Sequence, residues 1–173
     1  KWLDNDFYGT TFSANYKSDT MDFIFGGSYN KYEGDHFGKV IWARYASDSE
    51  LGDKYYDNNS FKKDGTFYTK ANYQMGENIS LFGDLQVRNV RYNVNAIETG
   101  LVNDNFNFFN PKAGLNYSIN DKNKLYFSYA RANREPNRTD YESGSVRPEK
   151  MDDYELGWRL LTKKRSEEHT SEL

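Results

Sequence analysis

Polar and apolar residues alternate along most of this 173-residue chain. A period of two with one polar face predicts β-strands, because successive side chains of a strand point to opposite faces. Seven segments show it, at 8–16, 21–29, 67–73, 79–87, 109–117, 125–130 and 153–159. In the fourth segment the alternation continues past Val87 to Asn93, where the more apolar face turns polar. We therefore expect that strand to be the longest and to extend beyond a bilayer, which about 9–11 residues suffice to cross.

The connections between these strands alternate in length. Short, Asn-, Asp- and Gly-rich segments at 17–20, 75–78 and 120–123 predict hairpin turns. Long connections are expected at 32–66, 95–106 and 132–151. Short turns at one end and long loops at the other are typical of outer-membrane barrels. Within the fifth strand, Pro111 cannot donate to a ladder and predicts a bulge or a position near the strand's upper end.

The two faces of the predicted strands differ in chemistry. One face carries the residues that we expect to contact lipid: Phe23, Phe25, Leu81, Leu85, Leu115, Leu125, Phe127, Leu156 and Trp158. Aromatic residues such as Tyr8, Tyr16 and Tyr73 lie at the ends of these stripes, as in interfacial girdles. The opposite face carries charges, including Asp84, Arg88 and Lys112, which suit a wet lumen better than a dry core. The predicted fold is all-β: an antiparallel meander of about seven strands, an open fragment of a large transmembrane β-barrel.

Composition narrows the function. The chain has 17% aromatic residues but a mean hydropathy of −0.99, which a barrel with one polar face reconciles. It has no Cys and a formal net charge of −3, which excludes thiolate sites and argues against nucleic-acid binding. We find no catalytic motif and expect neither enzymatic activity nor a cofactor. The acidic residues near His36 lack a regular calcium loop, so no metal site is predicted.

The last nine residues, 165–173, resemble the in-frame translation of a common sequencing-library adapter. We expect this segment to be an artefactual tail and residues 1–164 to be a partial outer-membrane barrel domain. The tail contains one Arg and three Glu, so the remainder has a net charge of −1. The chain also opens at Lys1 without Met or a signal peptide, and we expect it to be an interior piece of a longer protein.

Several phrases together resemble TonB-dependent outer-membrane receptors, of the kind found in Bacteroidetes-like bacteria. The main ones are Trp2–Gly9, Tyr32–Gly38, Leu81–Gln86, the run Tyr129–Arg138, and Pro148-Glu149 with Tyr154–Gly157. The resemblance covers residues 1–164. It implies a location in the bacterial outer membrane, a many-stranded barrel filled by an N-terminal plug, and uptake of a scarce ligand with energy from the TonB complex. The plug, through which TonB would be contacted, lies outside this sequence, and the small ligand is unknown: a ferric siderophore, a cobalamin-like molecule, an oligosaccharide or a peptide.

Two other functions fit the pattern. A passive porin-like channel would use the same strands without a plug. A secreted carbohydrate-binding β-sandwich would use the apolar stripes as its core.

Aromatic and cationic residues of the long connections are candidates for ligand binding: Trp42, Arg44, Tyr45, Tyr55, Tyr56, Arg134 and Arg138. They offer stacking surfaces and charged hydrogen bonds at the outward end of the barrel. The alternative for the aromatic residues is that they anchor the loops. The alternative for the arginines, including Arg131 and Arg147, is pairing with nearby carboxylates at the barrel lip, which we favour.

Overall fold

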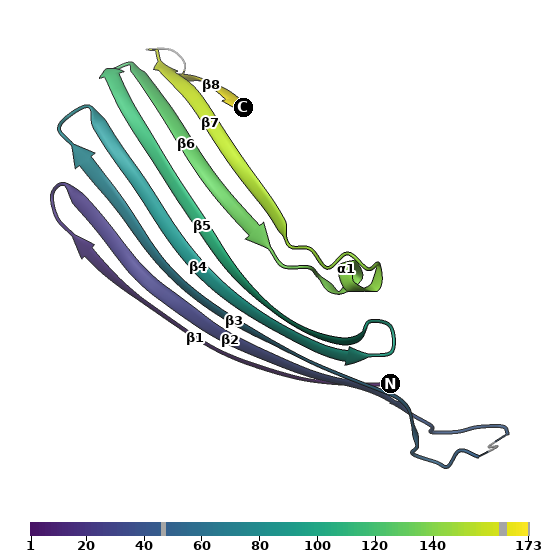
Figure 1. The fold of residues 1–173 in the computed structure, drawn as a ribbon. Coiled ribbons are helices and arrows are strands. Elements are labelled where there is room, and N and C mark those ends of the chain that lie inside the picture. Colours follow the sequence, from purple (N-terminus) through teal and green to yellow (C-terminus); the bar gives the residue numbers. More distant parts are fainter. Residues whose placement is uncertain (46–47, 163–165, 173) are drawn as a thin grey trace.

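The computed structural model describes residues 1–45, 48–162 and, for the backbone, 166–172. It is one antiparallel sheet in which every strand pairs with the next along the chain (Figure 1). The strands are β1 (Trp2–Lys17), β2 (Met21–Lys39), β3 (Lys54–Met75), β4 (Ile79–Ala96), β5 (Gly100–Asn120), β6 (Asn123–Arg134), β7 (Glu149–Leu161) and β8 (Ser166–Glu172). A short helix, α1 (Arg138–Glu142), lies between β6 and β7. The predicted all-β meander is confirmed.

The eighth strand pairs with β7 within the segment that we interpreted as an artefactual tail. An open sheet edge offers unpaired backbone groups that any extended segment can use. The pairing therefore says nothing about where the segment comes from, and the adapter interpretation stays a prediction. Residues 163–165 and 173 lie outside the described residues.

The three predicted hairpin turns gather at one end of the sheet, which we call the turn end, and the connections 40–53, 97–99 and 135–148 lie at the other, the loop end (Figure 1). All three predicted turns are confirmed, at 18–20, 76–78 and 121–122. The second contains Gly76 at φ 67°, a conformation that favours glycine. In the third, the Asn120 side-chain oxygen accepts hydrogen bonds from the backbone N–H groups of Lys122 and Asn123, both at 3.0 Å.

The strands reach farther toward the loop end than the pattern predicted. The connection expected at 32–66 shrinks to 40–53, because β2 and β3 continue as a paired hairpin. The long loop expected at 95–106 is wrong: β4 and β5 run on to a three-residue turn at 97–99. The expectation that the fourth strand is the longest is also wrong, since β4 has 18 residues, β3 has 22 and β5 has 21. The interpretation that β4 continues beyond a bilayer-crossing length agrees with its bounds.

Pro111 marks the place where two strands separate. The β4–β5 register runs through it without a shift, so the predicted bulge is absent from that ladder. The ladder between β5 and β6 ends one residue away, at Lys112 and Ala130. Above that point β6 pairs only with β7 in the described structure, and the two strands diverge from β5 (Figure 1). The Asn133 side chain bridges the gap by donating to the Phe109 carbonyl, 3.1 Å, and to the Asn110 side-chain oxygen, 2.7 Å.

The register assigns every strand residue to one of two faces. Residues that pair across the ladder share a face, so Phe25, Thr69, Leu85 and Pro111 form one row across β2–β5. We call this side the outer face. The opposite side, the inner face, holds the buried residues Asp84, Val90, Val94, Phe108 and Asn110. The core is thus an inner-face layer near the loop end and not a layer between two sheets.

Candidate functional site

Four charged residues of three chain segments meet on the inner face near the loop end. Alternation places Lys62 and Asp64 of β3 and Arg88 of β4 on that face, and Glu135 follows β6. The Lys62 Nζ lies 2.5 Å from Glu135 Oε1, and Arg88 Nη1 lies 2.9 Å from Glu135 Oε2. Arg88 also donates to both oxygens of Asp64, at 3.2 Å, 3.0 Å and 2.5 Å. We call these four residues the inner charge cluster.

The cluster holds Glu135 as a carboxylate. Burial alone would raise the pKa of this side chain, but hydrogen bonds from Lys62, from its own backbone N–H and from Arg88 outweigh that effect and lower the pKa to about 2. Because Glu135 directly follows β6, this bridge ties the connection between β6 and β7 to the inner face of β3 and β4.

The connection then folds over the inner face through α1. The Asn137 side chain accepts from the Asp140 N–H while the Asp140 carboxylate accepts from the Asn137 N–H, a capping box that starts the helix. Tyr141 of α1 stacks on Tyr92 of β4 with ring centroids 5.4 Å apart. Its hydroxyl donates to Asp104 of β5 at 2.7 Å, and burial together with this hydrogen bond raises the pKa of Tyr141. Residues 135–148 therefore form an inward-folded cap, which we call the cap segment.

Beside the cap lies a pocket of about 250 Å³ lined by Tyr32, His36, Asn58, Lys62, Tyr92 and Arg138, among others. The Asn5 side-chain oxygen of β1 accepts from the Tyr32 hydroxyl at 2.8 Å and lies 3.1 Å from His36 Nε2. Asn58 donates to Glu98 at 3.3 Å and accepts from the Ile97 N–H at 3.3 Å. Cations, phenols and amides offer hydrogen bonds and stacking, which suit the binding of a polar ligand. In the described part of the chain no group of three or more His, Cys, Asp or Glu residues could hold a metal ion.

The structure distributes the predicted ligand-binding residues over four places: the pocket, the exposed lip, the connection 40–53 and the start of β3. Arg138 lines the pocket beside the cap, where it pairs with Glu142 at 2.7 Å and Glu98 at 3.4 Å. Arg134 pairs with Glu149 at 2.6 Å on the exposed lip. Arg131, which the sequence also suggested as a partner of nearby carboxylates, pairs with Asp152 at 2.7 Å. The predicted charge pairing is thus confirmed for Arg131, Arg134 and Arg138. Their contact with a ligand stays a prediction.

The aromatic candidates lie apart from the pocket. Trp42, Arg44 and Tyr45 belong to the connection 40–53, which projects from the sheet (Figure 1). The Trp42 and Tyr45 side chains are 76% and 83% exposed, so the alternative that they anchor the loop finds no support. Tyr55 and Tyr56 are instead the second and third residues of β3 and make an edge-to-face contact with centroids 5.1 Å apart.

All nine residues predicted to face lipid lie on the outer face. Phe25 of β2 aligns with Leu85 of β4 through Thr69 of β3, and Phe23 aligns with Gly83 through Ala71. Leu81, Leu115, Phe127 and Leu156 form one row across β4–β7. Leu125 pairs with Trp158 one row nearer the turn end. Most of these side chains are exposed. The Tyr129 and Tyr154 rings, 4.9 Å apart, end the stripe on β6 and β7 toward the loop end. That these residues contact lipid stays a prediction.

The inner charge cluster was not among the predicted site residues. Lys62 and Asp64 lie in the stretch expected to be a loop, because both faces of β3 are polar there and hydrophobic alternation is lost. Glu135 lies in the long connection expected at 132–151, where no pattern of faces can be assigned. If the polar residues of this stretch are also taken to alternate with a period of two, Asn58, Ser60, Lys62 and Asp64 fall on one face. That pattern would have predicted that Lys62 and Asp64 lie on the same face of a strand.

Comparison with known proteins gives the family. The family model described as TonB-dependent receptor-like β-barrel matches residues 2–167. No curated protein sequence is significantly similar to the chain. None of the described helices is long and apolar enough to cross a bilayer.

Solved structures of such receptors share the fold. The copper transporter OprC superposes with a TM-score of 0.70 at 14% identity, with 93% of this chain covering 28% of that one. The ferric-catecholate import receptor Fiu from E. coli K12 gives 0.65 at 14% identity, with 93% and 29% covered. The FrpB iron transporter from Neisseria meningitidis gives 0.63 at 16%, with 93% and 27% covered. The chain thus spans less than a third of each of these receptors.

These findings agree with the antiparallel sheet, its apolar outer face and its charged inner face. They overturn the β-sandwich alternative, since the family model that matches residues 2–167 describes a β-barrel. The family consists of outer-membrane receptors and transporters, which supports the prediction that the chain is not an enzyme. The chain belongs to the TonB-dependent receptor β-barrel family, and its place is the bacterial outer membrane.

Proposed function

We propose that this chain is part of a longer outer-membrane receptor that binds a scarce ligand at its outward end and passes it into the periplasm with energy supplied through TonB. The observation that carries the proposal is the cap segment, tied by Glu135 to Lys62 and Arg88 on the inner face. In a complete barrel, a connection folded over the inner face would narrow the mouth, and the polar pocket would lie beside the path of an incoming ligand.

The ligand would meet two groups of side chains in turn. Trp42, Arg44 and Tyr45, on the projecting connection, are placed to make the first contact. Tyr32, Lys62, Tyr92 and Arg138, in the pocket beside the cap, would receive it next. Phenol rings and cations recognise anionic, oxygen-rich groups, which a catecholate or carboxylate chelate of iron provides. Since the similar structures include a copper transporter and two iron importers, we propose a metal chelate as the first ligand class to test.

A passive porin-like channel is the second candidate, because the same strands and the same charged inner face would serve a pore without a plug. Sequencing the source DNA on both sides of this gene separates the two. An upstream plug domain supports the receptor. Barrel strands alone upstream would overturn the proposal in favour of the pore.

The functional test uses the complete receptor in a host with and without an intact TonB complex. We expect uptake of a ferric catecholate to require TonB and to fall in a Lys62→Gln, Arg138→Gln double variant. A matched Lys112→Gln variant, which changes an inner-face cation outside the pocket, should keep uptake near that of the parent protein. Uptake that is independent of TonB would exclude active transport.

A further inference from the structure

Three cations lie side by side on the outer face just beyond the apolar stripe. In the register Lys31 of β2 pairs with Lys63 of β3, and Lys63 pairs with Arg91 of β4. Like charges directly opposite on neighbouring strands repel, since their Cβ atoms are only about 5 Å apart. We call these three residues the cation row. An anion bound beside the row would relieve this repulsion.

The protein supplies little of that compensation. Lys31 pairs with Glu33 at 2.7 Å. In the described part of the chain, neither Lys63 nor Arg91 forms an ion pair with a carboxylate; both lie near the Phe61 ring, at 5.5 Å and 5.9 Å from its centroid. By contrast, Arg131 and Lys150, on the same face of β6 and β7, share Asp152 at 2.7 Å and 3.2 Å. The cation row therefore keeps a net positive charge that the outer-face cations of β6 and β7 lack.

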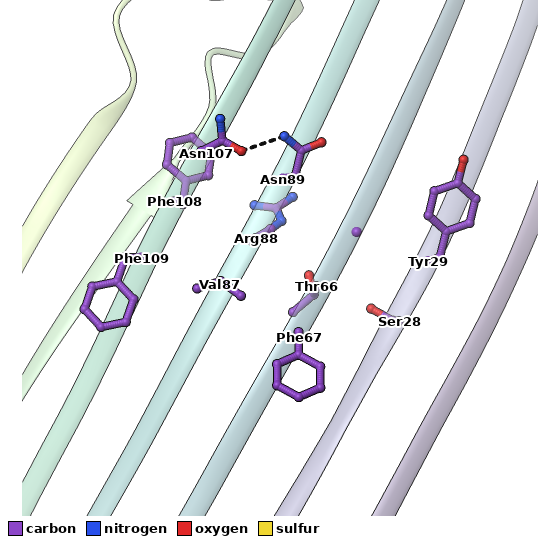
Figure 2. Close-up of a pocket in the computed structure, with 11 residues that line it drawn as sticks. Ser28, Tyr29, Thr66, Phe67, Val87, Arg88, Asn89, Asn107, Phe108 and Phe109 are labelled. Carbon is purple, nitrogen blue, oxygen red and sulfur yellow. Dashed lines mark hydrogen bonds between the residues drawn. The ribbon is translucent and has the colours of Figure 1, made fainter.

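An apolar groove opens directly below the row. Its volume is about 590 Å³, and on the outer face it is lined by Tyr29, Phe67, Val87, Phe109, Asn89 and Asn107 (Figure 2). Its floor is Gly65, two residues along β3 from Lys63, where the absence of a side chain leaves a gap in the outer face. The Asn89 amide donates to Asn107 at 2.7 Å and to Asn105 at 2.8 Å, so the polar edge of the groove is internally satisfied.

The cation row and the apolar groove are adjacent on the outer face. The cation row lies where the outer face turns from apolar to polar, with Phe67 and Val87 on one side of Gly65 and Lys63 on the other. In an outer-membrane protein this boundary is the level of the lipid headgroups. An apolar groove next to a row of cations fits an amphiphile. Its anionic head would lie on the cations and its hydrocarbon chain in the groove.

We propose that this face is a binding site for a membrane lipid whose phosphate headgroup carries a net negative charge: the phosphate lies on Lys31, Lys63 and Arg91, and one acyl chain lies in the groove over Gly65. The charge selects the phosphate, and the gap at Gly65 selects the chain. The inference rests on the outer-membrane location of the family and not on transport, so its failure would leave the proposed function standing.

Native mass spectrometry of the purified complete receptor, with dioleoyl phosphatidic acid and dioleoyl phosphatidylcholine as probes, tests the site. We expect retention of phosphatidic acid over phosphatidylcholine. A Lys63→Gln, Arg91→Gln double variant should lose about thirtyfold in affinity for phosphatidic acid, because each basic residue near a lipid surface contributes roughly a fivefold preference for anionic lipid. The affinity for phosphatidylcholine should not change.

Two further variants test the groove and the location. Gly65→Leu should weaken both lipids, and it should fold, since a Cβ at Gly65 meets only Tyr29 Cδ2 at 3.9 Å. Lys150→Gln, a change to an outer-face cation that already pairs with Asp152, should leave both affinities unchanged.

Equal retention of the two lipids by the parent protein would overturn the proposal, as would unchanged phosphatidic acid binding in the double variant. Displacement of phosphatidic acid by an equal concentration of inorganic phosphate would also overturn it, because the acyl chain would then contribute nothing.

Discussion

The two faces of this sheet share the same backbone ladder but reach stability in opposite ways. Near the loop end the inner face is completed by the chain itself: the inner charge cluster pairs its own ions, Tyr141 of the cap segment stacks on Tyr92, and Val90, Val94 and Phe108 are buried. The outer face is left open, and side chains such as Leu85, Val87 and Phe109 are about half exposed. An apolar surface of this extent is unstable in water and stable against hydrocarbon.

The two faces therefore depend on different partners. On the inner face near the loop end, the charged side chains pair with one another, so a mutation there acts through specific contacts. On the outer face, lipid supplies the missing contacts, so a mutation acts through transfer of its side chain into the bilayer. Matched substitutions on the two faces should therefore have unequal effects, and each prediction below uses that inequality.

The largest effect should come from a charge placed on the apolar outer stripe. Leu85→Arg moves a cation into the hydrocarbon region and should lower the free energy of unfolding by about 2–4 kcal/mol near the midplane. The control Asn72→Arg puts the same side chain at an exposed inner-face position that pairs with Asp22, and should change stability by less than about 1 kcal/mol. Urea unfolding of the complete receptor in lipid vesicles measures both. Equal costs at the two positions would contradict the assignment of faces.

The second effect is a loss of the cap segment in acid. The pKa of Glu135 in the fold, about 2, lies below its ordinary value of 4.5, so the bridge favours the ionised carboxylate. Its contribution is complete above about pH 4.5 and declines as the pH falls toward 2. From the size of the shift it is at most about 3 kcal/mol.

Hydrogen exchange of residues 135–148 checks this. Protection should fall between about pH 4.5 and 2, and Glu135→Gln should lower it at neutral pH because Lys62 and Arg88 lose their shared anion. Glu142→Gln, which removes only the exposed pair with Arg138, is the control and should alter exchange little. If the two variants behave alike, the inner charge cluster does not hold the cap segment.

The sequence was most informative where the two faces differ most. Apolar alternation predicted the seven strands and assigned Phe25, Leu85 and Trp158 to one face. The assignment is reliable because a shift of one residue would move every apolar side chain of a strand to the opposite face. It failed toward the loop end, where β2 and β3 are mainly polar on both faces, and where the buried apolar residues of β4 and β5, such as Val90, Val94 and Phe108, lie on the inner face. Strands 19–22 residues long were therefore partly interpreted as loops.

The candidate site was harder to predict, for a different reason. Arg138 was placed among the ligand-binding candidates because it lies in a connection, and the structure puts it in the pocket beside the cap. Lys62 and Glu135 are 73 residues apart in sequence, and only the inward fold of the cap segment brings them together. Composition and spacing carry no signal of that fold. The predicted aromatic residues of 40–53 remain candidates for first contact with a ligand and not for the pocket.

The smallest effect should come from the contrast between two strand glycines. Gly26 lies on the inner face, where an added Cβ would come 2.6 Å from the Phe12 carbonyl oxygen and 2.7 Å from the Tyr68 hydroxyl. Gly83 lies on the outer face, where an added Cβ meets nothing within 4 Å. Gly26→Ala should therefore cost about 1–2 kcal/mol through overpacking against backbone that cannot move alone. Gly83→Ala should be neutral or stabilising by about 0.5–1 kcal/mol, since alanine loses less conformational freedom than glycine on folding. The same vesicle unfolding experiment measures the difference. A cost at Gly83 equal to that at Gly26 would mean that the outer face is as tightly packed as the inner one, and the comparison of the two faces would fail.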